Sequence, residues 1–135
     1  MSGELVIFPD TVEALCDYVR TGLDTLGPAI PVGTRVPKPR PDLFVRIERV
    51  GGARRNLAID EPTVVFEAWG TDEGAAHDLA QQVRALVFGS VRQQTSAGMI
   101  YRVAESAGPA SLPDPDTDQA RFTFTMSVAV RGAVS

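Results

Sequence analysis

A strict alternation of apolar and polar residues near the C-terminus constrains the possible fold more than any other feature of the sequence. In the segment RFTFTMSVAVR, residues 121–131, the side chains of one parity are all apolar. They are Phe122, Phe124, Met126, Val128 and Val130. Because the side chains of a β-strand alternate between its two faces, this segment predicts a long strand with one buried and one solvated face. We expect it to serve packing, since nothing in it has a pattern typical of catalysis.

Length and composition indicate one soluble globular domain that covers residues 1–135. The 135 residues are close to the usual size of a domain, and 44% of them are hydrophobic, which suffices for a core. The single cysteine, Cys16, excludes an intrachain disulfide and is compatible with a reducing cytoplasm. The N-terminus lacks a signal-peptide pattern, and no apolar run approaches the ~20 residues of a membrane helix. We therefore expect a protein that stays soluble inside a cell.

The first part of the chain predicts a short strand at residues 5–8 and an amphipathic helix at residues 10–26. Asp10 is a suitable N-cap, and Glu13 follows three residues later, as in a capping box. Apolar residues then recur at steps of three or four and make one face of a helix. These residues are Val12, Leu15, Cys16, Val19, Leu23 and Leu26. Gly27 and Pro28 end the helix.

A proline-rich connector at residues 28–41 leads into a long hairpin arm at about residues 43–69. The five prolines of the connector exclude a helix and restrict strand pairing to the edge of a sheet. The arm has predicted strands at 43–50 and 63–69, with a turn at 51–56. In the first of these strands, Val45 and Ile47 are predicted to face inward, and Phe44 and Arg46 to face the other way.

A second helix is predicted to begin after Thr71 or Asp72 and to end at Gly89. It carries a stripe of small and apolar residues: Ala75, Ala76, Leu79, Ala80, Val83, Leu86 and Val87. Residues 99–105 and 121–131 predict strands, and residues 106–118 between them predict a mobile loop rich in Gly, Pro and Asp. The expected fold class is α+β, with a mixed or antiparallel sheet, two helices packed on one face and the element order β-α-β-β-α-β-β.

A search for chemistry gives mostly negative results. With His77 as the single histidine and Cys16 as the single cysteine, no zinc-binding set or nucleophilic triad is present in the sequence. No phosphate-binding or dinucleotide-binding glycine motif occurs either. His77 is expected at a solvated or boundary position of its helix. The sequence therefore predicts that the protein is not an enzyme and has no cofactor.

Three aspartates have the spacing of a calcium-binding loop but not its other requirements. Asp114, Asp116 and Asp118 fit ligand positions one, three and five of such a loop. Gln119 stands where the loop needs glycine, and Thr125 stands where it needs a bidentate glutamate. Turn formation explains the aspartates better, so we expect no metal site.

Charge is distributed unevenly along the chain. The whole sequence has a net charge of −4 and a pI near 4.9, which does not suggest general affinity for nucleic acid or for an anionic membrane. Residues 35–55, however, hold seven bases and two acids, a local charge of +5. This segment is either a basic arm on an acidic body or an ordinary solvated hairpin. No aromatic-interleaved RNA-binding pattern accompanies Arg54 and Arg55, so sequence-specific readout is not expected.

Two aromatic residues of the second arm strand have opposite parity. Phe66 and Trp69 therefore point to opposite faces of the sheet, and one of them faces away from the helix-covered core. A large aromatic side chain on that second face is explained either by a subunit contact or by a core with two sides.

The order of these elements and several short phrases resemble the tail terminator proteins of long-tailed (siphovirus-type) bacteriophages, particularly those of actinobacterial hosts. The phrases are the run PRPDLFVRIERVGGARRNLAIDEPTVVFEAWG, the Trp-Gly-Thr-Asp start of the second helix and the closing run YRVAESAGPASLPDPDTDQARFTFTMSVAVRG. The resemblance covers nearly the whole chain.

The resemblance implies a structural protein of the virion that forms a homo-hexameric ring. Such a ring caps the tail tube of major tail protein, ends tail polymerisation and provides the docking face for the head-closure or neck protein. It is located at the neck end of the tail, and in the host cytoplasm during assembly. Phage DNA passes through its lumen without sequence-specific binding, and no membrane takes part. Its contacts are surfaces, so we name Arg49, Arg54, Arg55, Glu67 and Trp69 as hypothetical interface residues.

Two other functions stay open at this point. A head-closure or neck protein would share the size, acidity and ring formation of a terminator, but it would bind the portal-adaptor complex and not the ends of tail tubes. A cytoplasmic ligand- or RNA-binding α+β module would instead use the basic segment 35–55. That module predicts a monomer or dimer with salt-dependent affinity for nucleic acid.

Overall fold

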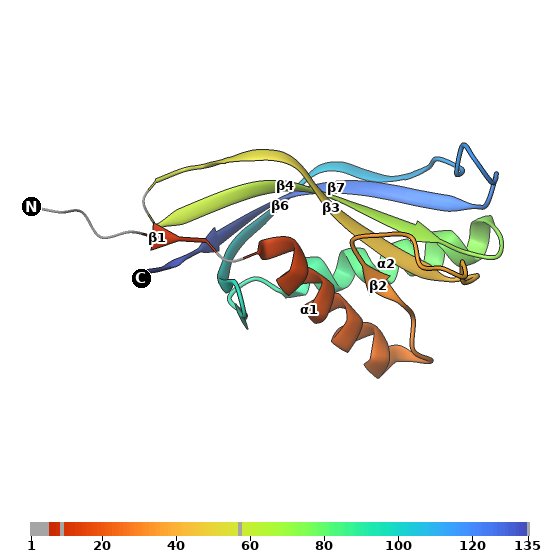
Figure 1. Cartoon of the computed structure of the whole chain (residues 1–135), viewed down its shortest axis with the longest axis horizontal. Coiled ribbons are helices and arrows are strands. Elements are labelled where there is room, and N and C mark those ends of the chain that lie inside the picture. The colour runs from red at the N-terminus through yellow and green to blue at the C-terminus, as the bar shows by residue number, and fades with distance from the viewer. Residues whose placement is uncertain (1–5, 9, 57, 135) are drawn as a thin grey trace, which may run out of the picture.

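A curved sheet with helices on one of its faces forms the body of the molecule in the computed structural model (Figure 1). The structure describes residues 6–8, 10–56 and 58–134. Helices α1 (Thr11–Leu26) and α2 (Glu73–Gly89) lie on the same face of the sheet, and none of the described residues forms a helix on the opposite face. Among the described residues, neither helix is long and apolar enough to cross a membrane.

In the described part of the chain, the main sheet has six strands. In spatial order they are β2 (Val32–Gly33), β3 (Phe44–Arg54), β4 (Ile59–Trp69), β7 (Arg121–Arg131), β6 (Gly98–Ser111) and β5 (Gln94–Thr95). β2 pairs with β3 in parallel, and the other pairs are antiparallel. β1 (Val6–Ile7) and β8 (Ala133–Val134) form a separate antiparallel pair, and Leu5, where the first strand was expected to begin, lies outside the described residues. The predicted α+β class is confirmed, with β2, β5 and β8 as additional short strands.

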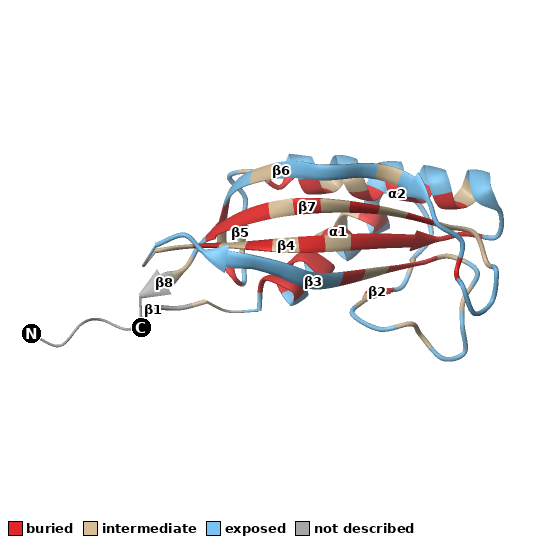
Figure 2. Ribbon diagram, turned by 90° about the horizontal axis from the view of Figure 1, so that it is seen from above, coloured by how far each residue is buried: buried red, intermediate tan, exposed pale blue. Residues whose placement is uncertain are grey.

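The predicted alternation is confirmed in β7, which lies between β4 and β6. Its even-numbered apolar residues are all buried, whereas Thr123, Thr125 and Ser127 on the other parity are half-buried (Figure 2). The buried parity of β7 meets that of β4 through cross-strand pairs such as Phe66 with Phe124, whose rings stack 4.8 Å apart. This face of the sheet is the one that the helices cover.

Helix α1 begins and packs as predicted, except at its last turn. The Asp10 carboxylate accepts a hydrogen bond from the backbone N–H of Glu13, at 3.1 Å, which caps the helix. The predicted apolar face is buried from Val12 to Leu23, but Leu26 is 58% exposed. Figure 1 shows the reason, because α1 is inclined to the sheet and its C-terminal end lies farthest from it. Leu26, the last residue of α1, instead lines a surface hollow together with Leu43 and Leu79.

Helix α2 is capped by Asp72, one of the two predicted caps, whose carboxylate accepts a hydrogen bond from Ala75 N at 2.8 Å. The stripe predicted for this helix is buried at Ala76, Leu79, Ala80, Val83 and Val87, and half-buried at Ala75 and Leu86. The small residues allow the helix to lie close to the strands beneath it.

The predicted turn at residues 51–56 was wrong in its position. β3 continues to Arg54, and β4 begins at Ile59, so the hairpin is longer than expected. The two glycines taken for a turn lie inside β3, where the register shifts between Arg49 and Gly51. Gly52 has a φ of 87°, a left-handed conformation that favours glycine. A β-bulge therefore accounts for the glycine pair.

The loop predicted at residues 106–118 is also shorter than expected. β6 extends to Ser111, and its ladder with β7 ends at the pair Ser111 and Phe122. Register shifts interrupt this ladder around Ala107, next to Gly108 and Pro109. Irregular pairing of this kind accommodates a glycine and a proline within a strand, which residue composition alone suggested to be a loop.

Candidate assembly interface

The helix-free face of the sheet carries its own aromatic pair. Trp69 of β4 stacks on Phe44 of β3 with ring centroids 4.4 Å apart, and both residues are buried. Phe66 points to the opposite face, as the parity of the two residues predicted, and this is the face that the helices cover. Two explanations were open for an aromatic residue on the second face. The structure supports a core with two sides, because Phe44 and Trp69 are already buried within the single chain. Phe44 also points away from Val45, as predicted.

Loops that are distant in sequence cover Trp69. Its indole Nε1 donates a hydrogen bond to Oδ2 of Asp114 at 3.1 Å, and Nη1 of Arg40 donates to the same oxygen at 3.1 Å. The guanidinium of Arg121 lies 5.5 Å from the centre of the indole ring. Asp114 Oδ1 accepts a hydrogen bond from the backbone N–H of Asp116 at 2.9 Å, which confirms that this aspartate forms a turn.

These hydrogen bonds stabilise the ionised form of Asp114. They lower its pKa from 3.8 to about 2, with the bond from the Asp116 backbone as the largest cause and with smaller contributions from Trp69 and Arg40. Desolvation acts in the opposite direction and does not prevail. Asp114 therefore joins the proline-rich connector, β4 and the turn before β7 through one buried carboxylate.

Glu67 lies beside this cluster, between two arginines. Arg121 Nη1 is 3.0 Å from Glu67 Oε2, and Arg46 Nη1 is 3.5 Å from Oε1. Burial raises the pKa of Glu67, although the two guanidinium groups oppose this shift. Among the described residues, Glu67 Oε1 and Arg46 Nε are buried without a hydrogen-bond partner. The contacts of Glu67 are therefore less complete than those of Asp114.

The arginines of the hairpin arm are balanced by three acids of β4 and by Glu48 of β3. Arg49 forms an ion pair with Asp60 at 3.0 Å, and Arg55 lies 3.6 Å from Glu61. Arg54 donates a hydrogen bond to the backbone oxygen of Asn56 at 3.0 Å and also lies 5.0 Å from the centre of the Phe8 ring. Residues 43–69 hold four arginines and four acids, so the arm as a folded unit is neutral.

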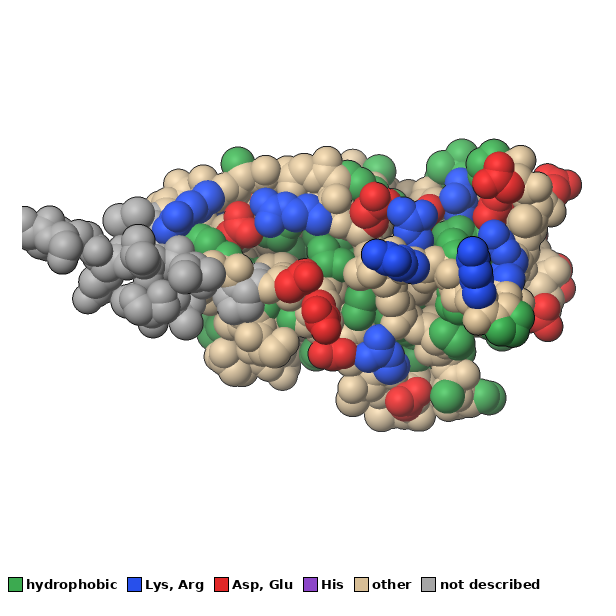
Figure 3. All heavy atoms as spheres, viewed as in Figure 1, with side chains coloured by type: hydrophobic (Ala, Val, Ile, Leu, Met, Phe, Trp, Pro, Cys, Tyr) green, Lys and Arg blue, Asp and Glu red, His purple; other side chains and the backbone are tan. Residues whose placement is uncertain are grey.

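The excess positive charge belongs to the connector. Arg35 and Lys38 are exposed and form no ion pair within the described ranges. Acidic side chains gather in contrast over the start of α1, where Asp10, Glu13 and Asp17 line a polar hollow (Figure 3). Counting charges along residues 35–55 did not separate the connector from the arm, because most of the acids that neutralise the arm lie in β4, outside this range.

The five proposed interface residues do not form one surface. Arg49, Arg54 and Arg55 lie in the part of the hairpin that surrounds its tip, and all three are exposed. Glu67 and Trp69 lie at the other end of β4 and are 8% and 1% exposed. His77, which we expected to be solvated, is exposed on α2, and the edge of its ring meets Phe122 with centroids 5.2 Å apart.

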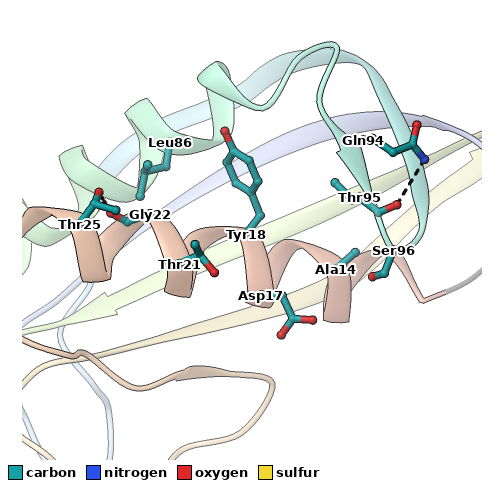
Figure 4. A pocket seen from close by; sticks show the side chains of 10 residues that line it. All are labelled: Ala14, Asp17, Tyr18, Thr21, Gly22, Thr25, Leu86, Gln94, Thr95 and Ser96. Atoms are coloured by element: carbon teal, nitrogen blue, oxygen red, sulfur yellow. Dashed lines mark hydrogen bonds between the residues drawn. The ribbon is translucent and has the colours of Figure 1, made fainter.

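A groove in the outer surface of the helix layer was not predicted. It consists of two hollows of about 390 and 470 Å³, and both are lined by Tyr18 of α1 and Leu86 of α2 (Figure 4). We call these two hollows together the helix groove. Gly22 lies in its floor, and Leu26 extends it toward the end of α1. Exposed apolar positions on the predicted helices were the available signal for it.

The fold and these surfaces define an α+β subunit whose polar clusters fasten its own strands and loops. A family model described as "Phage tail termination protein" matches residues 7–135, and the chain therefore belongs to this family. No curated protein matches the chain. Members of this family are structural proteins and not enzymes, so the protein is a structural tail terminator of a bacteriophage. It is a virion component that associates with other parts of the tail.

Proposed function

We propose that this protein forms a homo-hexameric ring that caps the tail tube, ends tail polymerisation and offers a docking face to the head. The observation that carries the proposal is the family match over residues 7–135. The ring would bind major tail protein on one side and a head-closure or neck protein on the other. It would be assembled in the host cytoplasm as one domain of residues 1–135 and would remain at the neck end of a long, siphovirus-type tail, in a phage of an actinobacterial host.

The charge distribution supports assembly into a closed ring. A ring made by rotation needs two different patches on each subunit, one for each neighbour. The acidic start of α1 and the exposed bases of the connector are two such unlike patches on one copy. The neutral hairpin and the net charge of −4 also suit a lumen through which DNA passes without strong phosphate binding.

We propose different roles for the five candidate interface residues. Arg49, Arg54 and Arg55 would place the hairpin tip against a neighbouring component. Glu67 and Trp69 are buried and would act indirectly, because they hold Arg121 and the covering loops in place.

The alternative functions have less support. A head-closure or neck protein would have a similar ring, but the matching family is described by tail termination. A nucleic-acid-binding module would use free cations along segment 35–55, whereas Arg49 and Arg55 are paired with acids. Within the described residues, Arg35 and Lys38 of this segment are exposed without an ion pair.

Electron microscopy of purified tail tubes incubated with the protein tests the proposal. A terminator adds a cap to one end of each tube and blocks further growth when major tail protein is supplied. A neck protein instead leaves bare tube ends uncapped and binds heads that carry the portal-adaptor complex. Capped tubes that continue to elongate would contradict the terminating role.

A further inference from the structure

The helix groove has the character of a binding surface. Its lining includes the side chains of Tyr18, Leu86 and Leu26, and Leu26 is 58% exposed. The helices approach closely at Gly22, where an added Cβ would lie 2.5 Å from Cδ2 of Leu86. An apolar hollow on the outside of a helix layer adds nothing to the core and is typical of a contact with another molecule.

The rim of this groove on α1 is acidic. Asp17 lines the hollow of about 390 Å³, and Asp24 lies seven residues further on, so both project from the same side of the helix. Residues 10–26 hold four acids and one base, Arg20, which pairs with Asp17 at 2.8 Å. The side chain of Asp24 has no cation partner within the described residues. The groove therefore suits an apolar segment that carries positive charge.

The connector of the same chain has the matching chemistry. Residues 34–41, TRVPKPRP, combine three prolines with Arg35, Lys38 and Arg40. Both ends of this segment are fastened, because β2 pairs with β3 and Arg40 pairs with Asp114 at 3.1 Å. Arg35 and Lys38 between these anchors are exposed. Prolines restrict the backbone, so such a segment loses little entropy when it binds.

We propose that residues 34–41 of one copy bind in the helix groove of the next copy. The inference rests on the proposed ring and names the contact that would close it. The prolines would pack on Tyr18, as proline-rich segments do on aromatic grooves. The exposed bases Arg35 and Lys38 would face Asp17 and Asp24. Each copy has one groove and one connector, which is the pair of unlike patches that a head-to-tail ring requires.

Charge reversal tests this contact. Lys38→Glu and Asp24→Lys each raise the concentration at which half of the protein is assembled, by roughly tenfold. The double variant Lys38→Glu with Asp24→Lys restores the opposite charges and returns this concentration to within about threefold of the wild type. Glu73→Lys is the matched control, since Glu73 is exposed on α2 outside the groove, and it leaves assembly unchanged. Thermal melts confirm that all the variants fold.

Cysteine crosslinking in mixed rings shows whether the contact joins two copies. One population carries Thr21→Cys in the groove and the other carries Lys38→Cys, so a disulfide between them must be intermolecular. Native Cys16 is buried, and burial raises its pKa to about 11, so it does not compete. We expect several times more crosslinked dimer than in a control mixture in which Thr71→Cys takes the place of Thr21→Cys.

The outcomes separate this contact from the ring itself. Rings that form without charge rescue and without crosslinks overturn the groove contact and leave the proposed function intact. A wild-type protein that forms no ring, with or without tail tubes, overturns both.

Discussion

At the residue scale, one carboxylate holds together parts of the chain that are far apart in sequence. Asp114 binds Arg40, which is 74 residues away, and Trp69, which is 45 residues away. The parity of the strand predicted that one of Phe66 and Trp69 would face away from the helices, and in the structure this residue is Trp69. Strand parity could not predict which residues cover Trp69, because these contacts depend on how the connector and the turn before β7 fold back over the sheet. Only the turn-forming role of Asp114 could be inferred locally.

Replacing this carboxylate should destabilise the subunit. Asp114→Ala leaves the indole N–H and the Arg40 guanidinium without their shared acceptor, so we expect a loss of about 2–4 kcal/mol in the free energy of unfolding. Asp116→Ala changes an exposed side chain of the same turn and should cost less than about 0.5 kcal/mol. Urea unfolding measures both values. Equal losses for the two variants would refute the role of Asp114.

The lowered pKa of Asp114 also predicts how this effect varies with pH. Because its pKa falls from 3.8 to about 2 on folding, the stabilisation is complete above about pH 4 and is lost as the pH falls toward 2. The difference in stability between the wild type and Asp114→Asn should therefore be constant from pH 7 to 5 and should shrink between pH 4 and 2. A difference that grows toward acid pH would have the wrong sign for this account.

At the scale of elements, helices were predicted more accurately than the ends of strands. Capping residues and the apolar repeat gave both helices nearly their observed bounds. Alternation predicted the bounds and the buried face of β7, since no glycine or proline interrupts it, but Ala129 on the other parity is also buried. Local composition predicted a turn or a loop at positions where bulges let the strands continue. These positions are Gly51, Gly52, Gly108 and Pro109. Pairing with a neighbouring strand overrides local preference at these positions, and a sequence pattern does not contain that pairing.

The bulge in β3 makes a prediction with a matched control. Gly52 has a φ of 87°, and a Cβ there would collide with the backbone oxygen of Glu61. Gly52→Ala should therefore reduce the free energy of unfolding by about 1–3 kcal/mol. A Cβ at the adjacent Gly51 meets open space, so Gly51→Ala should change it by less than about 1 kcal/mol. Chemical denaturation of the two variants distinguishes a bulge from a flexible turn, for which both changes would be similar.

At the scale of the whole molecule, unlike surfaces on one subunit are the basis for assembly. The acidic side of α1 adjoins the connector, since Asp10, Glu13 and Asp17 line one hollow with Thr34, and the exposed bases of the connector follow from Arg35 (Figure 3). Counting charges along the sequence located the basic segment but assigned its charge to the hairpin. Apolar positions on the predicted helices were the one signal for the helix groove, and its shape could not be predicted because the hollows depend on how the two helices pack.

The hairpin tip should matter more to assembly than to folding. Replacing both Arg54 and Arg55 with Glu should reduce the yield of capped tubes severalfold, because the two exposed residues reverse the local charge of the proposed contact. The melting temperature of the subunit should change by only a few degrees. Normal capping by this variant, or a large loss of subunit stability, would count against the arm as an assembly surface.

The solution mass of the purified protein tests the central claim most directly. Light scattering across a concentration series, with and without purified tail tubes, should give either six times the 14.4 kDa subunit mass or a monomer that is recruited to tube ends. A monomer whose mass is independent of concentration and that ignores tail tubes would contradict the ring and its role as a cap.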